Sequence, residues 1–442
     1  MVAELDRNRK GRWVSTTAVE ATSLAEIECV LRALLEASSP ALDPPASRGR
    51  PRILPAYVLW SGLLVCVLRG FSSQLELWRL LREGGFWDYP GFPIDDQTVY
   101  QRLEQGGTVA LETLFSQLSQ LLAARLEPWV AADLAPFATQ VVALDETTLD
   151  PVARKLPALR GAPTEATIPG KLAGLFDLRM QQWQTLQFQP EFRQNEKVLA
   201  RALIRDLPEA SLILADLGYF SFAWFDELTT AGHWWLSRLR DKTSYAPIHT
   251  FYADGQVRDE LVWLGAYRAD KARYAVRLVQ FRYGNQVHRY ITNVDDPRLL
   301  SIAEIARLYA RRWDIEMAVQ LVKEHLGLGL LWSAKPAVIQ QQLWAVLTIA
   351  QIVQALRVEA AGRAGVDLFD VSLPLLVRYL PRYAAAGRDP LAAFLEAGVR
   401  LKFIRPSRRV QLSAPVPDLC DYTWPPPELI RERTPRYARR KC

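Results

Sequence analysis

The sequence predicts an α/β protein with a helical N-terminal region and a strand-rich segment inserted before its last helices. Three patterns predict this class. Apolar residues with helical spacing run to about residue 135, short buried strands then alternate with a helix, and residues 233–293 alternate with the period of β-structure. The chain has 442 residues, of which 50% are hydrophobic and 23% charged. This is an ordinary globular composition, sufficient for two or three domains.

The first 135 residues are expected to form helices joined by loops. The apolar run near residues 53–68 is short for a membrane span, so we expect a buried helix and no membrane association. A basic stretch before it, RGRPR, has two interpretations. It could lie in an A·T-rich minor groove, or it could be a solvated linker, which is the commoner fate of short basic runs. Its cationic side chains are Arg48, Arg50 and Arg52.

A second candidate for DNA recognition is the segment PIDDQTVYQRLEQGG at residues 93–107. Its acidic start suits a helix N-terminus. It could be the second helix of a helix-turn-helix motif or a plain helix of a bundle. In the first case it would present four side chains to DNA, namely Gln97, Thr98, Gln101 and Arg102.

From about residue 138 the pattern changes to that of a sheet. An apolar strand, Val141–Leu144, ends at Asp145. Residues 171–190 read as two strands around a turn at 180–182, and a helix is expected from Asn195. A second buried strand, Leu212–Ala215, ends at Asp216. Strands separated by a helix indicate an α/β sheet.

The two strand ends predict a carboxylate site. Ligands of open α/β sheets bind at the carboxyl ends of the strands, so Asp145 and Asp216 would converge there if their strands are neighbours. Glu316, on a later helix, could add a third carboxylate. Such an oxygen-only set suits Mg²⁺ or Mn²⁺, and two ions about 4 Å apart would activate a water or a 3′-hydroxyl against a phosphodiester. The competing carboxylates nearby are Glu146, Asp150 and Asp177.

The helix expected after Ser301 carries a polar stripe. At about 100° per residue, four side chains fall on one narrow face: Tyr309, Arg312, Glu316 and Lys323. If the helix is considered without the rest of the sequence, the simplest interpretation of this stripe is a solvent-exposed face. Beside a carboxylate site, however, a hydroxyl, a guanidinium and an ammonium are phosphate ligands. We therefore expect Tyr309, Arg312 and Lys323 to hold a nucleic-acid backbone.

The same residues carry a family resemblance over about residues 138–360. The spacing Y-x-x-R-x-x-x-E-x-x-x-x-x-x-K from Tyr309 to Lys323 resembles the signature of bacterial insertion-sequence DDE transposases of family four. LDETTL around Asp145 resembles the first-aspartate motif of that family, and ADLGYFS around Asp216 resembles the second.

The resemblance implies an RNase H-like catalytic core, with Asp145, Asp216 and Glu316 as the metal-binding residues. It also implies a homodimer that acts on double-stranded DNA, at terminal inverted repeats and at a target. Family members nick each element end, form a hairpin with the freed 3′-hydroxyl, reopen it and join the end to target DNA. They also stack a flipped base on an aromatic ring. Candidates for this ring are Trp313, Tyr290 and Trp263, with core packing as the alternative, especially for Trp263.

We accordingly expect five segments: a DNA-binding helical domain (1–135), a first core part (136–232), a β-rich insertion (233–293), a second core part with C-terminal helices (294–400), and a basic Pro-rich tail (401–442). The net charge of +6 fits a polyanionic partner. Four cysteines without metal-ligand spacing and an N-terminus unlike a signal peptide favour the bacterial cytoplasm. The alternative functions are an RNase H-like nuclease without strand transfer and a non-catalytic, transposase-derived DNA-binding protein.

Overall fold

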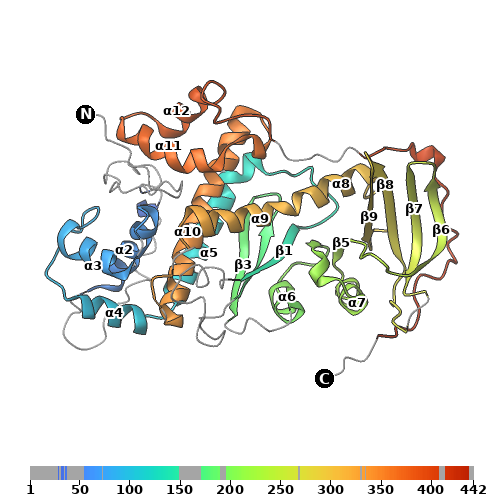
Figure 1. Cartoon of the computed structure of the whole chain (residues 1–442), viewed down its shortest axis with the longest axis horizontal. Helices are drawn as coiled ribbons and strands as arrows, with labels where there is room; N and C mark the ends of the chain where they lie inside the picture. The colour runs from blue at the N-terminus through green and yellow to red at the C-terminus, as the bar shows by residue number, and fades with distance from the viewer. Residues whose placement is uncertain are drawn as a thin grey trace.

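The computed structural model (Figure 1) describes six residues between 28 and 36 and then 54–71, 73–148, 171–189, 196–266, 269–328, 331–333, 335–407 and 414–437. The basic stretch with Arg48, Arg50 and Arg52 lies outside these residues. The molecule is elongated, with N-terminal helices at one end, a sheet running through the middle and the strand-rich insertion at the other end.

The N-terminal region is helical, as the spacing of its apolar residues predicts. Its elements are α2 (Ala56–Leu68), α3 (Gln74–Arg79), the π-helical η2 (Leu80–Gly84), α4 (Asp96–Gln105), α5 (Val109–Leu126) and the short η3 (Glu127–Trp129). The Ser73 hydroxyl caps α3 by accepting a hydrogen bond from the Glu76 backbone N–H at 3.2 Å. Helix α2 is buried along nearly its whole length, as expected for the apolar run there.

A single sheet of nine strands runs through the rest of the described chain, in the order β3-β2-β1-β4-β5-β9-β8-β7-β6. Its strands are β1 (Val141–Thr148), β2 (Lys171–Asp177), β3 (Gln182–Gln189), β4 (Leu212–Ala215), β5 (Trp234–Arg238), β6 (Tyr245–Ala253), β7 (Val257–Leu264), β8 (Val276–Tyr283) and β9 (Gln286–Thr292). Strand β1 is antiparallel to β2 and parallel to β4, and β4 is parallel to β5. The first strand of the expected insertion (233–293), β5, pairs with β4 in the middle of the sheet, and β6–β9 extend the sheet from it, because β9 pairs antiparallel with β5.

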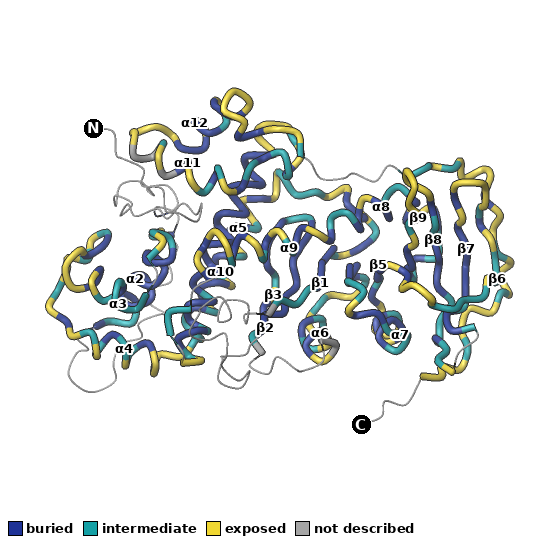
Figure 2. Tube along the Cα trace, in the orientation of Figure 1, coloured by how far each residue is buried: buried dark blue, intermediate teal, exposed yellow. Residues whose placement is uncertain are grey.

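The central strands are buried on both faces. Val141 and Ala143 of β1 belong to the larger core, whereas Val142 and Leu144 belong to the smaller one. This alternation follows from the two-residue period of a strand. Helices α6 (Glu196–Ile204) and α7 (Phe222–Thr230) cover the smaller core, and the long helix α10 (Pro336–Ala364) is the centre of the larger one. Figure 2 shows this burial along the strands and α10.

Helix α10 has the length and apolar composition of a membrane span, but 94% of its most apolar window is buried inside the protein. It packs against α2, α4 and α5, so it joins the N-terminal helices to the sheet. This burial is that of a core helix. The C-terminal elements follow it: η8 (Leu368–Asp370), α11 (Leu373–Ala385), α12 (Pro390–Ala397) and η9 (Leu419–Asp421).

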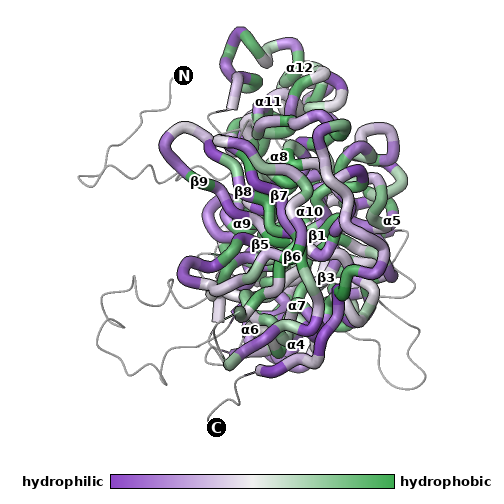
Figure 3. Tube along the Cα trace, turned by 90° about the vertical axis from the view of Figure 1, so that its right-hand side faces the viewer, coloured by the Kyte–Doolittle hydropathy of each residue, from purple (hydrophilic) through white to green (hydrophobic). Residues whose placement is uncertain are grey.

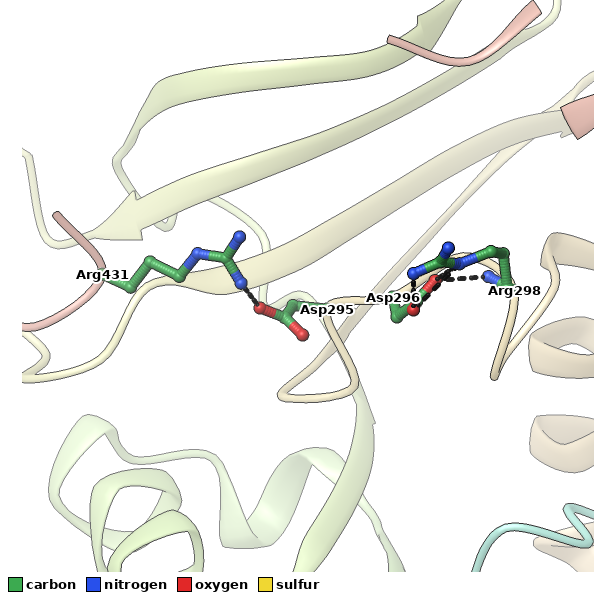
Figure 4. Close-up of polar contacts among 4 residues, drawn as sticks. All are labelled: Asp295, Asp296, Arg298 and Arg431. Carbon is green, nitrogen blue, oxygen red and sulfur yellow. Dashed lines mark hydrogen bonds and ion pairs between the residues drawn. The ribbon is translucent and has the colours of Figure 1, made fainter. Parts of the chain in front are cut away.

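Residues 414–437 of the predicted tail lie along the insertion. The Thr423 backbone N–H donates to the Phe251 carbonyl at 2.8 Å, at the outer edge of β6. Arg431 forms an ion pair with Asp295, close to where Arg298 pairs with Asp296 (Figure 4). The insertion and this segment face the viewer in Figure 3, where hydrophilic and hydrophobic stretches occur along both. Backbone pairing of this kind protects an exposed sheet edge.

Candidate active site

Two neighbouring parallel strands bring the predicted aspartates together. Leu144 of β1 is in register with Ala215 at the end of β4, and Asp145 and Asp216 are the next residues. The expectation that the strand ends at Asp145 was wrong, because β1 continues to Thr148 by pairing with β2. Only Val141–Leu144 pair with β4, so both aspartates lie at the carboxyl end of this buried, parallel part of the sheet. Each strand is fully buried up to this point, and the carboxylates are placed where the chain first reaches solvent. This is the adjacency that the strand-end positions predicted.

The third carboxylate comes from the helical segment that follows the insertion. Ser301 caps α8 (Ile302–Arg311) by accepting a hydrogen bond from the Glu304 N–H at 3.2 Å. The helix is interrupted at Arg312, resumes as α9 (Trp313–Gln320) and ends in the π-helical η7 (Leu321–His325). The expectation of one regular helix was therefore wrong in detail. The interruption and the π-turn shift Lys323 from its position on an ideal helix, and π-turns are frequent at functional sites.

Asp145 lies within electrostatic range of the other two carboxylates. Its pKa is raised to about 6, mainly by burial and to a smaller extent by the charges of Glu316 and Asp216. The Glu146 backbone N–H, which donates to Asp145 Oδ1 at 2.8 Å, and the Arg312 guanidinium oppose this shift in pKa. The surroundings of Asp145 thus favour its neutral form more than water does.

The polar stripe is not a solvated face. Tyr309 and Arg312 are only 2% and 4% exposed. Arg312 donates to Glu316 Oε1 at 2.7 Å, and Lys323 Nζ donates to Thr147 Oγ1 at 2.6 Å, beside Asp145. Burial lowers the pKa of Lys323, and the Asp145 carboxylate opposes that shift. The stripe therefore faces the strand ends.

The competing carboxylates are engaged elsewhere. Glu146 is one position along β1 from Asp145 and forms an ion pair with Lys171 of β2. Asp177 accepts hydrogen bonds from the backbone N–H groups of Arg179 and Met180, both at 2.8 Å, in the turn after β2. Asp150 lies outside the described residues.

The three carboxylates of Asp145, Asp216 and Glu316 offer oxygen donors of the kind that bind a hard divalent cation. Within the part of the chain that the structure describes, no three His, Cys, Asp or Glu side chains converge closely enough to hold one ion between them as they stand. The three carboxylates nevertheless interact electrostatically. Carboxylate oxygens are the ligands that Mg²⁺ and Mn²⁺ prefer, and a cation here would favour the ionised form of Asp145, which burial disfavours.

The aromatic candidates separate into two groups. Tyr290 and Trp313 line a cavity of about 910 Å³ next to the stripe, with the Tyr290 and Tyr309 ring centroids 4.9 Å apart. Trp313 is 51% exposed, whereas Tyr290 is fully buried. Trp263 is on β7 with the Arg433 guanidinium 4.5 Å from its ring centroid, away from this cavity.

The predicted recognition helix is α4. Gln97 and Gln101 are exposed, whereas Thr98 and Arg102 are half-buried, and Arg102 donates to the Leu54 carbonyl at 3.4 Å. The long connection between η2 and α4, residues 85–95, differs from the short turn of a helix-turn-helix motif. Helix α4 also packs against α10, whose Gln341 side chain donates to the Leu103 carbonyl at 2.6 Å. These contacts favour the bundle-helix interpretation.

Two further residues join the site without having been predicted. Thr147 accepts the Lys323 hydrogen bond, and the Arg238 guanidinium lies 5.0 Å from the Tyr309 ring centroid. Thr147 is two positions after Asp145 and so on the same side of β1, a signal that strand periodicity could have provided. Arg238 ends β5, and its position beside Tyr309 depends on the packing of distant segments.

Comparison with known proteins bears on the same region. Residues 136–352 match the family described as "Transposase DDE domain". The chain is similar to "Transposase InsG for insertion sequence element IS4" of Escherichia coli (strain K12), with 26% identity over 173 residues, which cover 37% of this chain and 38% of that protein. The match thus spans well under half of the relative's length.

A solved structure, the "Cryo-EM structure of piggyBac transposase synaptic complex with hairpin DNA (SNHP)", is similar with a TM-score of 0.38 and 12% identity over 88% of this chain and 85% of that one. This likeness is too weak to carry an argument. The family match and the insertion-sequence relative agree with each other, and the matched range 136–352 includes Asp145, Asp216 and Glu316. Residues 136–352 are therefore a transposase DDE domain, and part of the chain is similar to a transposase of an insertion sequence.

Proposed function

We propose that this protein is a DNA transposase that cleaves the ends of an insertion sequence and joins them to target DNA. One observation carries the proposal. Asp145 and Asp216 lie at the carboxyl end of the parallel pairing between β1 and β4, and Glu316 is within electrostatic range of Asp145, all inside the transposase domain. Carboxylates grouped in this way are the protein's part in metal-assisted phosphodiester cleavage.

The sheet order supports an RNase H-like core. The five strands β3-β2-β1-β4-β5 form an antiparallel trio continued by parallel strands, with α6 and α7 against one face and α9 against the other. We infer that this unit is the catalytic core and that β6–β9 are its insertion. The N-terminal helices and the basic stretch before them would recognise the inverted repeats of the element.

In the proposed mechanism, Asp145, Asp216 and Glu316 would hold two divalent cations, Mg²⁺ or Mn²⁺. Such ions would supply Lewis-acid chemistry, that is, activation of the attacking hydroxyl and stabilisation of the leaving oxygen. Arg312 orients Glu316 through their 2.7 Å hydrogen bond. Lys323, Arg312 and the hydroxyl of Tyr309 bind phosphates of the transposon end, which fixes the scissile bond beside the carboxylates.

The aromatic cavity supports a hairpin route. Tyr290 and Trp313 line it beside the stripe. A base extruded from the tightly bent end would stack on the exposed Trp313 ring, and such stacking contributes about 1–3 kcal/mol per base. Trp263 has no place in this step, because it packs under Arg433. Two copies of the chain would bring both ends together, in the bacterial cytoplasm.

Cleavage of a plasmid that carries the element's ends tests the proposal. We expect Glu316→Gln and Asp145→Asn to abolish Mg²⁺- or Mn²⁺-dependent cleavage while retaining end binding in a gel shift. Glu324→Gln is the matched control, because Glu324 is on the same helical path but exposed and paired with Gln320. Cleavage by Glu316→Gln at the wild-type rate would refute the assignment.

Strand transfer separates the proposed transposase from the alternative functions. Pre-cut ends incubated with target plasmid should give joined products with the wild-type protein. A nuclease that only cuts would degrade the ends without joining them. A non-catalytic DNA-binding protein would shift the ends in a gel and leave them intact with every divalent metal.

A further inference from the structure

The cavity next to the stripe has a second wall that comes from the C-terminal unit. Its volume is about 910 Å³. One side is formed by α8, α9 and β9, with the rings of Tyr290, Tyr309 and Trp313. The other side is formed by η8, the start of α11 and residues 402–407, which lie beyond the matched transposase domain. The cavity is therefore bounded by two parts of the chain that are distant in sequence.

The C-terminal wall is held in place by its backbone. The Ser372 N–H donates to the Phe403 carbonyl at 2.9 Å, and the Arg405 N–H donates to the Asp370 carbonyl at 3.0 Å. The Asp370 carboxylate, the one acidic group among the described lining residues, accepts a hydrogen bond from the Ser407 N–H at 2.8 Å. The segment that carries Lys402 and Arg405 is thus a fixed edge of the cavity.

Three cations surround the opening of this cavity. Arg238 comes from the end of β5, and Lys402 and Arg405 come from the C-terminal wall. All three are exposed. Among the described residues, no carboxylate lies within ion-pair distance of any of them, in contrast to Arg312, which is paired with Glu316. Exposed cations that are not neutralised by a carboxylate attract polyanions.

We propose that Arg238, Lys402 and Arg405 form a phosphate-binding rim that grips a single DNA strand as it passes over the aromatic cavity. The inference rests on the proposed function, and it assigns the C-terminal unit a direct part in holding the substrate. Its basis is charge complementarity, because cations around stacking rings are the combination that binds single-stranded nucleic acid. The exposed Trp313 ring supplies the stacking surface, and the rim supplies sequence-independent contacts to the DNA backbone.

The test is binding of a fluorescein-labelled oligo(dT) 12-mer to the full-length protein in EDTA, measured by anisotropy over a range of NaCl concentrations. Lys402→Gln/Arg405→Gln removes two charges and keeps unbranched polar side chains, and Gln adopts the φ of 58° at position 402 no worse than Lys does. We expect the affinity to fall by about tenfold or more. We also expect the plot of log affinity against log NaCl concentration to become less steep by about 1.4, since each phosphate contact contributes about 0.7 to this slope for single strands. Arg238→Gln should lower the slope by about half as much.

Two controls make the result specific. Arg400→Gln removes an exposed charge near Lys402 that does not line the cavity, and it should leave both affinity and slope unchanged. Trp313→Ala should weaken binding by about tenfold with an unchanged slope, because stacking carries no counterion release.

The rim is refuted if the wild-type protein does not bind the oligonucleotide, if Lys402→Gln/Arg405→Gln binds with the wild-type slope, or if Arg400→Gln weakens binding equally. Failure of the proposed function is distinguishable, because it would appear as cleavage by Glu316→Gln while these binding differences persist. Circular dichroism spectra that match the wild type establish that each variant is folded.

Discussion

Lys323 Nζ donates a hydrogen bond to Thr147 Oγ1 at 2.6 Å, which joins η7 to β1 two residues beyond Asp145. The contact joins residues that are far apart in the sequence but belong to two motifs of the site. It places the Lys323 ammonium within electrostatic range of the Asp145 carboxylate. Thr147 is therefore expected to position Lys323 for a phosphate.

Removing this hydroxyl should weaken end binding without abolishing the fold. Thr147→Val keeps the shape of the side chain but removes the acceptor, and a lost hydrogen bond of this kind costs about 0.5–1.5 kcal/mol, or about 2- to 10-fold in affinity. Thr147→Ser keeps the hydroxyl and should bind like the wild type. Affinity for an end duplex, measured by anisotropy, checks both, and equal affinities of the Val and Ser variants would contradict the role.

A buried ion pair within the insertion is also hydrogen-bonded to the segment that leads into α8. Arg277 of β8 and Asp259 of β7 are fully buried and bonded to each other, with one contact at 2.8 Å, and Arg277 Nη1 donates to the Leu300 carbonyl just before α8 at 2.6 Å. Arg277→Met would leave the Asp259 charge buried without its partner. We expect a loss of about 3–5 kcal/mol in unfolding free energy, seen as a large fall in the thermal midpoint.

The double variant Arg277→Met/Asp259→Leu provides the control for this prediction. It removes both charges, so it should recover a substantial part of the stability lost by the single variant. A double variant that is as unstable as the sum of the two single ones would show that the pair has no coupling.

Gly362 of α10 is required by a close contact with Trp129. A Cβ at this position would overlap the indole ring, so Gly362→Ala should destabilise by about 1–3 kcal/mol, although alanine is the better helix former. Gly84→Ala is the matched control, because its Cβ would meet only the Leu80 side chain at an ordinary 3.7 Å. Thermal unfolding should show a lower midpoint for the first variant alone.

Acidification should destabilise the fold through His233. Burial lowers the pKa of this histidine, so the folded protein holds it neutral while the unfolded chain binds a proton near its ordinary value. The stability it contributes is complete above the unfolded pKa of 6.5 and is lost as pH falls through the lower folded pKa. His233→Phe should therefore reduce the drop in thermal midpoint between pH 7.5 and pH 5.5, and an unchanged drop would contradict this assignment.

The strand ends and the helix signature could be located from sequence because both are local patterns. The buried run Leu212–Ala215 predicted a strand with Asp216 at its end, and the spacing from Tyr309 to Lys323 predicted a common face. The break at Arg312 and the π-turn at Lys323 could not be predicted, since side-chain spacing does not determine where a helical hydrogen-bond pattern shifts.

The C-terminal wall of the cavity could not be predicted from the sequence either. Residues 402–407 reach the site because Ser372 and Asp370 hold them against η8 and α11, which are long-range contacts without a periodic signal. Arg238 was overlooked for the same reason. Its sequence context is an ordinary strand end, and only the fold places its guanidinium over Tyr309.

Asp145→Asn should have opposite effects on the metal-free protein and on its response to metal. The ionised wild-type carboxylate is destabilised by burial and by its two acidic neighbours. The neutral amide should therefore raise the free energy of unfolding of the metal-free protein by up to about 2 kcal/mol, seen as a higher thermal midpoint. Asn can still accept the Glu146 N–H hydrogen bond. Mg²⁺ at 100 times its dissociation constant should stabilise the wild type by about 2.7 kcal/mol, and this gain should be largely absent in Asp145→Asn. Thermal scans with EDTA and with increasing Mg²⁺ measure both effects, and an equal gain in the two proteins would exclude Asp145 as a ligand.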